Sequence, residues 1–303
     1  MRTAAADTLL RTLAFHRTWG HAPTRAEWIA TLDVGSDAFS REETESALST
    51  LVESGSVAYH AGRFVFASDG PEAIDRIREN EFWAARKYRV AHHAASWLSR
   101  LGSVRFVALC NTAALGHARD GSDLDLFVVT RKGTVSATRV VSAMLFELLG
   151  RRPKPGHARD AICLSYFVAE DGLDLSGHML TPDDPYFRFW FLSLVPLYDD
   201  GVGQGLWDAN RLITSRHPFS RTWMVPPDLR VPTPRVRVPI PTVFERLAER
   251  LQAKAFPDAI RRLINQDTRV MVSPTVLKFH VDDRRESYRQ EYQSFCMNRG
   301  IAL

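Results

Sequence analysis

The stretch Gly121–Val129 reads Gly-Ser-Asp-Leu-Asp-Leu-Phe-Val-Val, and the rest of the chain is interpreted outward from it. Its apolar end predicts a strand, with Asp123 and Asp125 two positions apart at the start. Side chains alternate along a strand, so both carboxylates point to the same face. Two like charges on one face repel each other unless a cation lies between them. Hard divalent cations such as Mg²⁺ are bound in this way, by one or two carboxylates together with substrate phosphates.

The residues before this stretch predict a second strand and a short polar turn. Val104–Leu109 is apolar and β-prone, and Cys110–Gly116, which follows it, contains the small polar pair Asn111-Thr112. We therefore expect a strand, a turn, a short helix, a loop and then the acidic strand. This layout resembles the core of the DNA polymerase β-like nucleotidyltransferase superfamily. The signature of that superfamily is a Gly-Ser pair followed, after a short interval, by Asp-x-Asp and an apolar tail.

The resemblance implies a reaction and a metal site. Asp123 and Asp125 match the metal-binding pair, so they are expected to be catalytic and to hold Mg²⁺ in a two-metal site, with Mn²⁺ as an alternative cation. The reaction implied is the transfer of a nucleoside monophosphate from an NTP to an acceptor hydroxyl. The acceptor is RNA, a protein or a small molecule. The run from about residue 76 to the end also looks like a group of bacterial nucleotidyltransferase-domain proteins without a settled substrate.

Substrate-binding residues are carried over by the same resemblance. Asn111 and Thr112 stand where the superfamily has Gly-Ser; Asn111 can adopt the left-handed conformation, and Thr112 keeps a hydroxyl for the phosphates. Ser122 is expected to bind substrate beside the acids. Arg139, on the helix after the acidic strand, is the preferred phosphate-binding cation. Arg131 and Lys132 are the second choices for that role. His117, in the loop before the acids, could line the cleft.

A third carboxylate usually comes from a later strand in this superfamily. Asp174 lies between two leucines and is preferred for that role over Asp160, which precedes the buried strand expected at 162–168. The changed Gly-Ser pair and the uncertain third acid leave an alternative function open. In that alternative the fold has lost its chemistry, and the chain acts as a nucleotide-sensing, partner-docking or DNA-binding regulator.

Composition is that of an ordinary globular protein. The 303 residues, 45% hydrophobic and 24% charged, are enough for about two domains. The three cysteines are scattered and odd in number, so they indicate neither a disulfide framework nor a zinc site. No signal peptide or apolar run long enough for a membrane span is found, so we expect a cytoplasmic protein without membrane contact. A net charge of +4 is compatible with a phosphate-bearing substrate or nucleic acid.

The expected fold class is α+β, and its first part is a winged helix-turn-helix. Capping boxes at Thr24/Glu27 and Ser40/Glu43 predict the starts of two of its three helices, and a hairpin follows. The acidic third helix makes DNA binding the minor alternative to docking of a partner. The expected parts are a winged helix-turn-helix (1–68), a connecting helix (71–102), a nucleotidyltransferase core with a mixed β-sheet and flanking helices (103–224), a Pro-rich connector (225–241) and a helical C-terminal region (242–303).

Two segments of this division keep more than one interpretation. The aromatic stretch Phe187–Leu197 is a core helix or a strand, since a short apolar run does not distinguish the two. The Pro-rich connector is a spacer or an arm lying in a groove, and the spacer is favoured.

Overall fold

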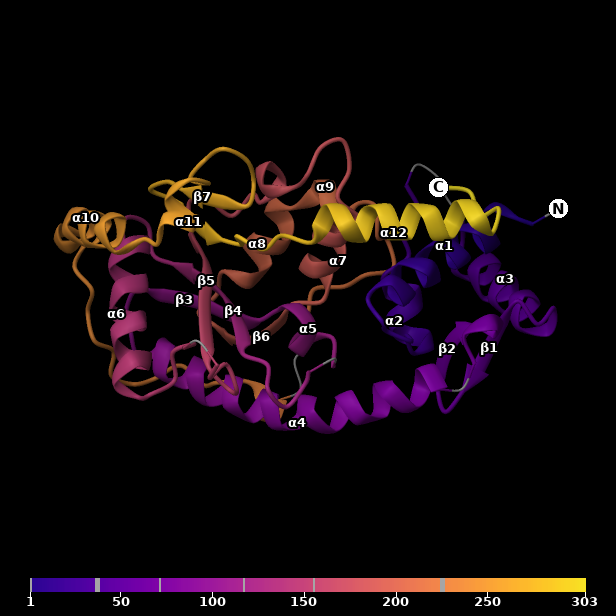
Figure 1. Cartoon of the computed structure of the whole chain (residues 1–303), viewed down its shortest axis with the longest axis horizontal. Helices are drawn as coiled ribbons and strands as arrows, with labels where there is room; N and C mark the ends of the chain where they lie inside the picture. The colour runs from indigo at the N-terminus through magenta and orange to yellow at the C-terminus, as the bar shows by residue number, and fades with distance from the viewer. Residues whose placement is uncertain (1, 36–38, 71, 117, 155, 224–226) are drawn as a thin grey trace.

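A six-stranded mixed sheet forms the centre of this α+β protein (Figure 1). The computed structural model describes residues 2–303 except 36–38, 71, 117, 155 and 224–226. The strands run in the order β6-β3-β4-β5-β8-β7, and β4 and β5 are parallel while the other neighbours are antiparallel. Their bounds are β3 Val104–Leu109, β4 Leu124–Thr130, β5 Ile162–Ala169, β6 Val195–Asp199, β7 Val270–Val272 and β8 Val276–Phe279.

Helices cover both faces of this sheet because its strands are apolar on both sides. In β4, Leu126 and Val128 enter the core beneath helices α4 and α6, whereas Phe127 and Val129 enter the core beneath α7. The α5 turn connects β3 to the loop before β4. The aromatic stretch with two interpretations contains both elements, since α7 ends at Leu192 and β6 follows. The helices of this part are α4 Glu72–Ser99, α5 Asn111–Ala114, α6 Val135–Leu148, α7 Pro185–Leu192, α8 Gly203–Ala209 and α9 Arg211–Thr214.

The N-terminal residues 4–66 pack around a hydrophobic core that contains the fully buried Trp28 and also Phe189 of α7. The predicted order of three helices and a hairpin is present. Both predicted capping boxes are formed, at Thr24 and at Ser40. The elements of this N-terminal module are α1 Ala4–Thr18, α2 Arg25–Ala30, α3 Arg41–Glu53, β1 Val57–His60 and β2 Arg63–Phe66.

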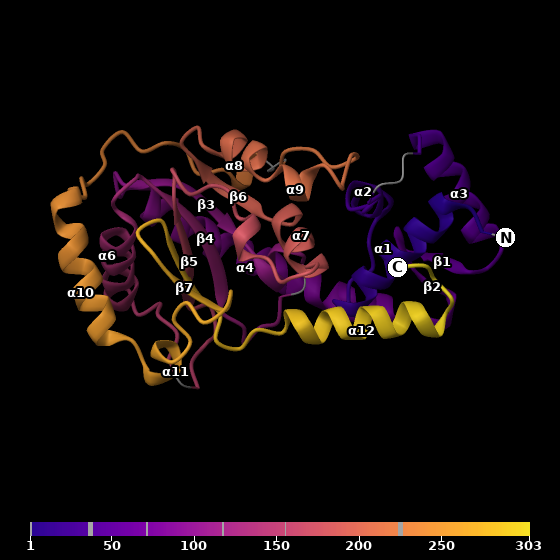
Figure 2. The ribbon, with the colours of Figure 1, turned by 90° about the horizontal axis from the view of Figure 1, so that it is seen from above.

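Two long helices link the N-terminal module to the sheet. Helix α4 runs along one side of the molecule, and α12 (Arg285–Asn298) runs along the opposite side toward α1 (Figures 1 and 2). Helix α12 buries Tyr292 and Cys296 in the core of the module. The end of the chain therefore completes the hydrophobic core of its beginning.

The region 242–303, expected to be helical, is divided among three places. Helix α10 (Glu245–Ala255) packs on α6, and the short α11 (Asp258–Arg261) follows it. Strands β7 and β8 then extend the sheet beside β5 before α12 begins. These two strands are short, and β8 acquires its place by pairing with β5, which local sequence does not reveal.

The described part of the Pro-rich connector, residues 227–241, is held against the core. Val231 N donates to Leu197 O at 2.6 Å, and Val238 forms a bridge with Leu101. Arg237 pairs with Asp200 at 2.8 Å. This part of the connector is thus packed against the core. Residues 225 and 226 lie outside the described part of the chain. Single-turn 3-10 helices occur at Ala67–Asp69, Ser176–His178, Pro227–Leu229 and Thr242–Phe244.

Candidate metal and nucleotide site

Three potential metal ligands converge where β4 and β5 begin. Asp125 is the second residue of β4, Asp123 directly precedes that strand, and Cys163 is the second residue of β5. The parallel register places Cys163 opposite Asp125. One carboxylate oxygen of each aspartate and the Cys163 Sγ all lie within 4.8 Å of one another. All three side chains are half-buried, so a cation from solvent can reach them.

The turn after β3 holds Asp125 in position. Asn111 has a φ of 59°, the left-handed conformation expected for this residue. Its Nδ2 donates to Asp125 Oδ2 at 2.8 Å. The backbone N–H of Cys110 donates to the carbonyl of Asp125 at 3.1 Å. Asn111 thus fixes the orientation of one carboxylate of the pair.

The electrostatics of the pair favour a cation. Burial and the neighbouring charge of Asp125 raise the pKa of Asp123 above its ordinary value. Burial and the charge of Asp125 likewise raise the pKa of the Cys163 thiol. Among the described residues, no lysine or arginine forms an ion pair with Asp123 or Asp125. Two converging carboxylates that no described lysine or arginine pairs with directly fit a divalent metal ion, which would relieve their mutual repulsion.

Helix α4 fixes the loop that leads into β4. Lys87 is 0% exposed. Its Nζ lies 3.0 Å from Asp160 Oδ1 and donates to the carbonyls of Asp120, also at 3.0 Å, and Ser122. Arg86 pairs with Asp120 at 2.6 Å and also with Asp160. Asp160 is therefore used in this ion cluster, and the sequence carries no signal that Lys87 would be buried.

The structure does not bring Asp174 to the acidic pair. No strand forms over residues 173–175, and the exposed Asp174 side chain accepts a hydrogen bond from Ser176 N at 2.9 Å. Asp174 follows the end of β5, whereas Cys163 lies at its start, so the whole strand separates the two. The position expected for a third carboxylate, on the strand beside the pair, is occupied by Cys163. The sequence did not predict Cys163 as a site residue because the register of β4 and β5 cannot be read from it. Only in that register does Cys163 face Asp125.

Arg139 is engaged on α6 instead of reaching the acidic pair. Its Nε donates to Leu164 O at 3.2 Å, and a terminal nitrogen donates to Gln252 Oε1 at 2.7 Å. The guanidinium also lies 4.5 Å from the ring centroid of Phe279. Burial and the charge of Arg152 lower the pKa of Arg139 to about 10. Its observed contacts are those of a packing residue.

The other predicted substrate contacts are divided between the two ends of β4. Thr112 is exposed at the start of α5 and keeps the expected place beside Asn111. The Ser122 hydroxyl donates to Arg119 O at 2.9 Å, so it stabilises its own loop. Arg131 and Lys132 follow the far end of β4, where they contact Ile240 O and Asp171. His117 lies outside the described residues.

Comparison with family models, curated proteins and solved structures finds no match for this chain. None of the helices within the described ranges combines the length and the apolar character needed to cross a membrane.

Proposed function

We propose that the chain is a divalent-cation-dependent nucleotidyltransferase of the DNA polymerase β-like kind, which transfers a nucleoside monophosphate from an NTP to an acceptor hydroxyl. The observation that carries the proposal is the pair Asp123/Asp125, convergent, half-buried and without an ion-pair partner in the described part of the chain. Such a pair is suited to Mg²⁺ or Mn²⁺ shared with substrate phosphates. The acceptor stays open among RNA, protein and small molecule.

Each residue of the site has a distinct part in this proposal. Asp123 and Asp125 would hold the metal ion, and Asn111 orients Asp125 through its 2.8 Å hydrogen bond. When bound, the cation supplies stabilisation of the charge that develops on the transferred phosphate. The exposed Thr112 offers a hydroxyl at the mouth of the turn where phosphate would approach. Lys87 keeps the loop before β4 in place through Asp160 and two backbone carbonyls.

A double Asp123→Asn/Asp125→Asn variant tests this assignment. We expect Mn²⁺ affinity, measured by calorimetric titration, to fall at least about a hundredfold, because both charged ligands become neutral amides of the same size. Transfer of label from radioactive NTPs to cell extract should be lost with it, and chelation of the metal should do the same to the native protein. Asp174→Asn is the matched control, since it neutralises an exposed carboxylate outside the cluster. Equal Mn²⁺ binding by native protein and double variant would refute the site.

One observation favours the alternative function, a metal- or nucleotide-sensing protein without transfer activity. The Asn111 side chain fills the position where the superfamily has glycine and is bonded to Asp125. It therefore occupies space that an approaching phosphate needs. Label transfer distinguishes the two functions: NTP binding without any transfer under Mg²⁺ or Mn²⁺ supports the sensor.

Asn111→Gly measures the effect of this side chain. Glycine adopts the observed φ of 59° without strain, so the turn should persist. We expect Mn²⁺-dependent NTP binding to tighten by about threefold to tenfold, the effect of one weak polar interaction, because space opens for phosphate. Thr112→Ala is the control in the same turn. Weaker NTP binding by Asn111→Gly would contradict this expectation and show that the amide supports binding, through its hydrogen bond to Asp125 or through the nucleotide itself.

For the N-terminal module we propose a winged helix that docks a partner, with DNA binding as the minor alternative. Glu42 and Glu43 are exposed on α3, and the nearest cation on this helix, Arg41, lies 3.9 Å from Glu45. A helix with this charge repels a phosphate backbone. Absence of salt-dependent binding to duplex DNA would agree with docking, and steeply salt-dependent binding would contradict it.

A further inference from the structure

We infer that Cys163 is the third protein ligand of the candidate metal site, and that it gives the site a preference for thiophilic cations such as Zn²⁺ over Mg²⁺. This inference rests on the proposed function in so far as it shares Asp123 and Asp125. It goes further, because it concerns which cation the chain selects. It also assigns a role to a cysteine whose sequence spacing gives no hint of metal binding.

The first support is the geometry of the sheet. Cys163 and Asp125 are paired in the parallel register of β5 and β4, so their side chains emerge side by side on the same face. The Cys163 Sγ lies within 4.8 Å of a carboxylate oxygen from each aspartate. One cation placed among the three atoms would lie at most about 2.8 Å from each of them. Small side-chain rotations would then bring the atoms to the bond lengths of about 2.0–2.3 Å that metal–oxygen and metal–sulfur bonds require.

The second support is that Cys163 is a free thiol whose polar contacts are to Ser165 and Asp125, beside the acidic pair. It forms no disulfide, and it is half-buried where the other cysteines are buried. Cys110 directs its S–H toward the carbonyl of Asp125 at 3.3 Å. Cys296 lies in the core of the N-terminal module. Among the described residues, Cys163 is thus the cysteine available to an ion at the acidic pair.

The chemistry of the donor set determines the preference. Three carboxylates would form an all-oxygen site of the type that Mg²⁺ and Mn²⁺ prefer, whereas a thiolate is a soft ligand that selects Zn²⁺ and its heavier analogue Cd²⁺. Zinc accepts mixed sulfur and oxygen ligands. On binding, the S–H bond of Cys163 breaks, a metal–sulfur bond forms and the proton passes to the buffer. No oxidant or reductant takes part.

Cadmium titration of the full-length, metal-depleted chain tests the inference. We expect a saturable ultraviolet thiolate-to-Cd²⁺ charge-transfer band in the native protein. In Cys163→Ser the band should vanish and Cd²⁺ affinity should fall at least about tenfold, while Mn²⁺ affinity changes less than about threefold. Cys163→Asp should shift the preference toward Mn²⁺ by restoring a third carboxylate. Cys296→Ser, which removes a buried thiol elsewhere, should keep the band.

A second measurement uses only the native protein, so it tests the inference even if Cys163→Ser does not fold. Cd²⁺ should protect Cys163 of the native chain from iodoacetamide, with the alkylated residue located by mass spectrometry. An undiminished band in Cys163→Ser, or alkylation at Cys163 that Cd²⁺ does not slow, would overturn the inference. Failure of the proposed function gives a different result. A Cys163-dependent band without NTP transfer would refute the proposed reaction but keep Cys163 as a metal ligand. Mg²⁺-dependent NTP transfer without the Cd²⁺ band would refute Cys163 as a ligand and keep the proposed reaction.

Discussion

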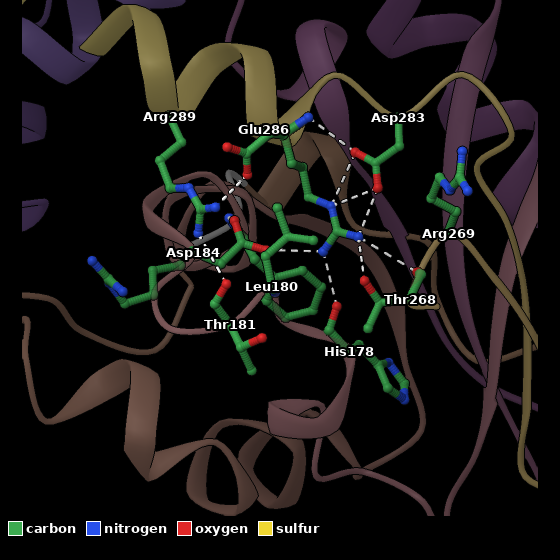
Figure 3. A network of polar contacts seen from close by, with 12 residues as sticks. His178, Leu180, Thr181, Asp184, Thr268, Arg269, Asp283, Glu286 and Arg289 are labelled. Atoms are coloured by element: carbon green, nitrogen blue, oxygen red, sulfur yellow. Dashed lines mark hydrogen bonds and ion pairs between the residues drawn. The ribbon is translucent and has the colours of Figure 1, made fainter. Parts of the chain in front are cut away.

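Arg285→Met is expected to lower the free energy of unfolding by about 3–5 kcal/mol, the range found when one partner of a buried ion pair is removed. The Arg285 side chain is 4% exposed and pairs with Asp184 Oδ2 at 2.9 Å and Asp283 Oδ2 at 2.7 Å. It also donates to His178 O at 2.9 Å and Thr268 Oγ1 at 2.7 Å. Figure 3 shows how this network joins Asp184, Asp283 and Thr268 from three segments.

The large effect follows from what the substitution leaves behind. The Asp184 and Asp283 side chains are only 1% and 8% exposed. Burial raises the pKa of Asp283, but the hydrogen bonds and charge of Arg285 outweigh it and hold the pKa below its ordinary value. Methionine fills a similar volume without charge, so two carboxylates would remain buried without their main counter-cation.

Urea unfolding, followed by tryptophan fluorescence and circular dichroism, measures the loss. Arg284→Met is the matched control, because Arg284 is the preceding residue, is exposed and stacks on Tyr288 at 5.1 Å. We expect this control to cost less than about 1 kcal/mol, as for an exposed cation–π contact. A loss in Arg285→Met no larger than that of the control would contradict the expectation. Arg285 begins α12, which links the sheet to the N-terminal module. We therefore also expect the module of Arg285→Met to separate from the sheet at a lower urea concentration than in the native protein.

Lys278→Met is expected to change the pH dependence of stability. Lys278 is 1% exposed on β8, and its Nζ donates to Thr268 O at 2.7 Å. Burial, reinforced by the charge of Arg285, lowers the pKa of Lys278 from 10.5 to about 7. The unfolded chain therefore binds one more proton than the folded chain between about pH 7 and pH 10.5.

The sign follows from this difference in protons. Because the unfolded state holds the extra proton, native stability from this group rises as pH increases through the window, with a limiting slope of about 1.4 kcal/mol per pH unit. The stability of Lys278→Met should lack that slope. Its gain in stability over the native protein should be largest near pH 7 and below. Urea titrations at pH 7, 8 and 9 compare the two, with the exposed Lys132→Met as control. Parallel pH profiles for native protein and Lys278→Met would show that Lys278 keeps an ordinary pKa.

Features encoded by neighbouring residues were predicted from the sequence. The capping boxes at Thr24 and Ser40 form because each depends on hydrogen bonds over three residues of one helix. The left-handed Asn111 follows from the conformational preference of that side chain. The α+β class and the strands at β3, β4 and β5 follow from apolar runs whose length and neighbours identify them.

Features that depend on distant segments were predicted poorly. Asp174 has the same local pattern as a strand carboxylate, but no neighbouring strand pairs with residues 173–175, so the segment stays a loop. Arg139 lies on the expected helix, yet α10 supplies Gln252 and β8 supplies Phe279 to occupy its guanidinium. Lys87 is buried because the two loops that carry Asp120 and Asp160, before β4 and before β5, contact its ammonium group.

The strand that carries Asp125, with Asp123 directly before it, was predicted from sequence alone, because β-propensity acts over a few residues. Tertiary structure alone decided that Cys163 faces this pair. Strands β4 and β5 are parallel, so a crossover through α6 separates them, and their register is set by packing of both sheet faces instead of by a tight turn. The same applies to α12, whose place against α1 depends on burial of Tyr292 and Cys296 in a core formed by the first residues of the chain.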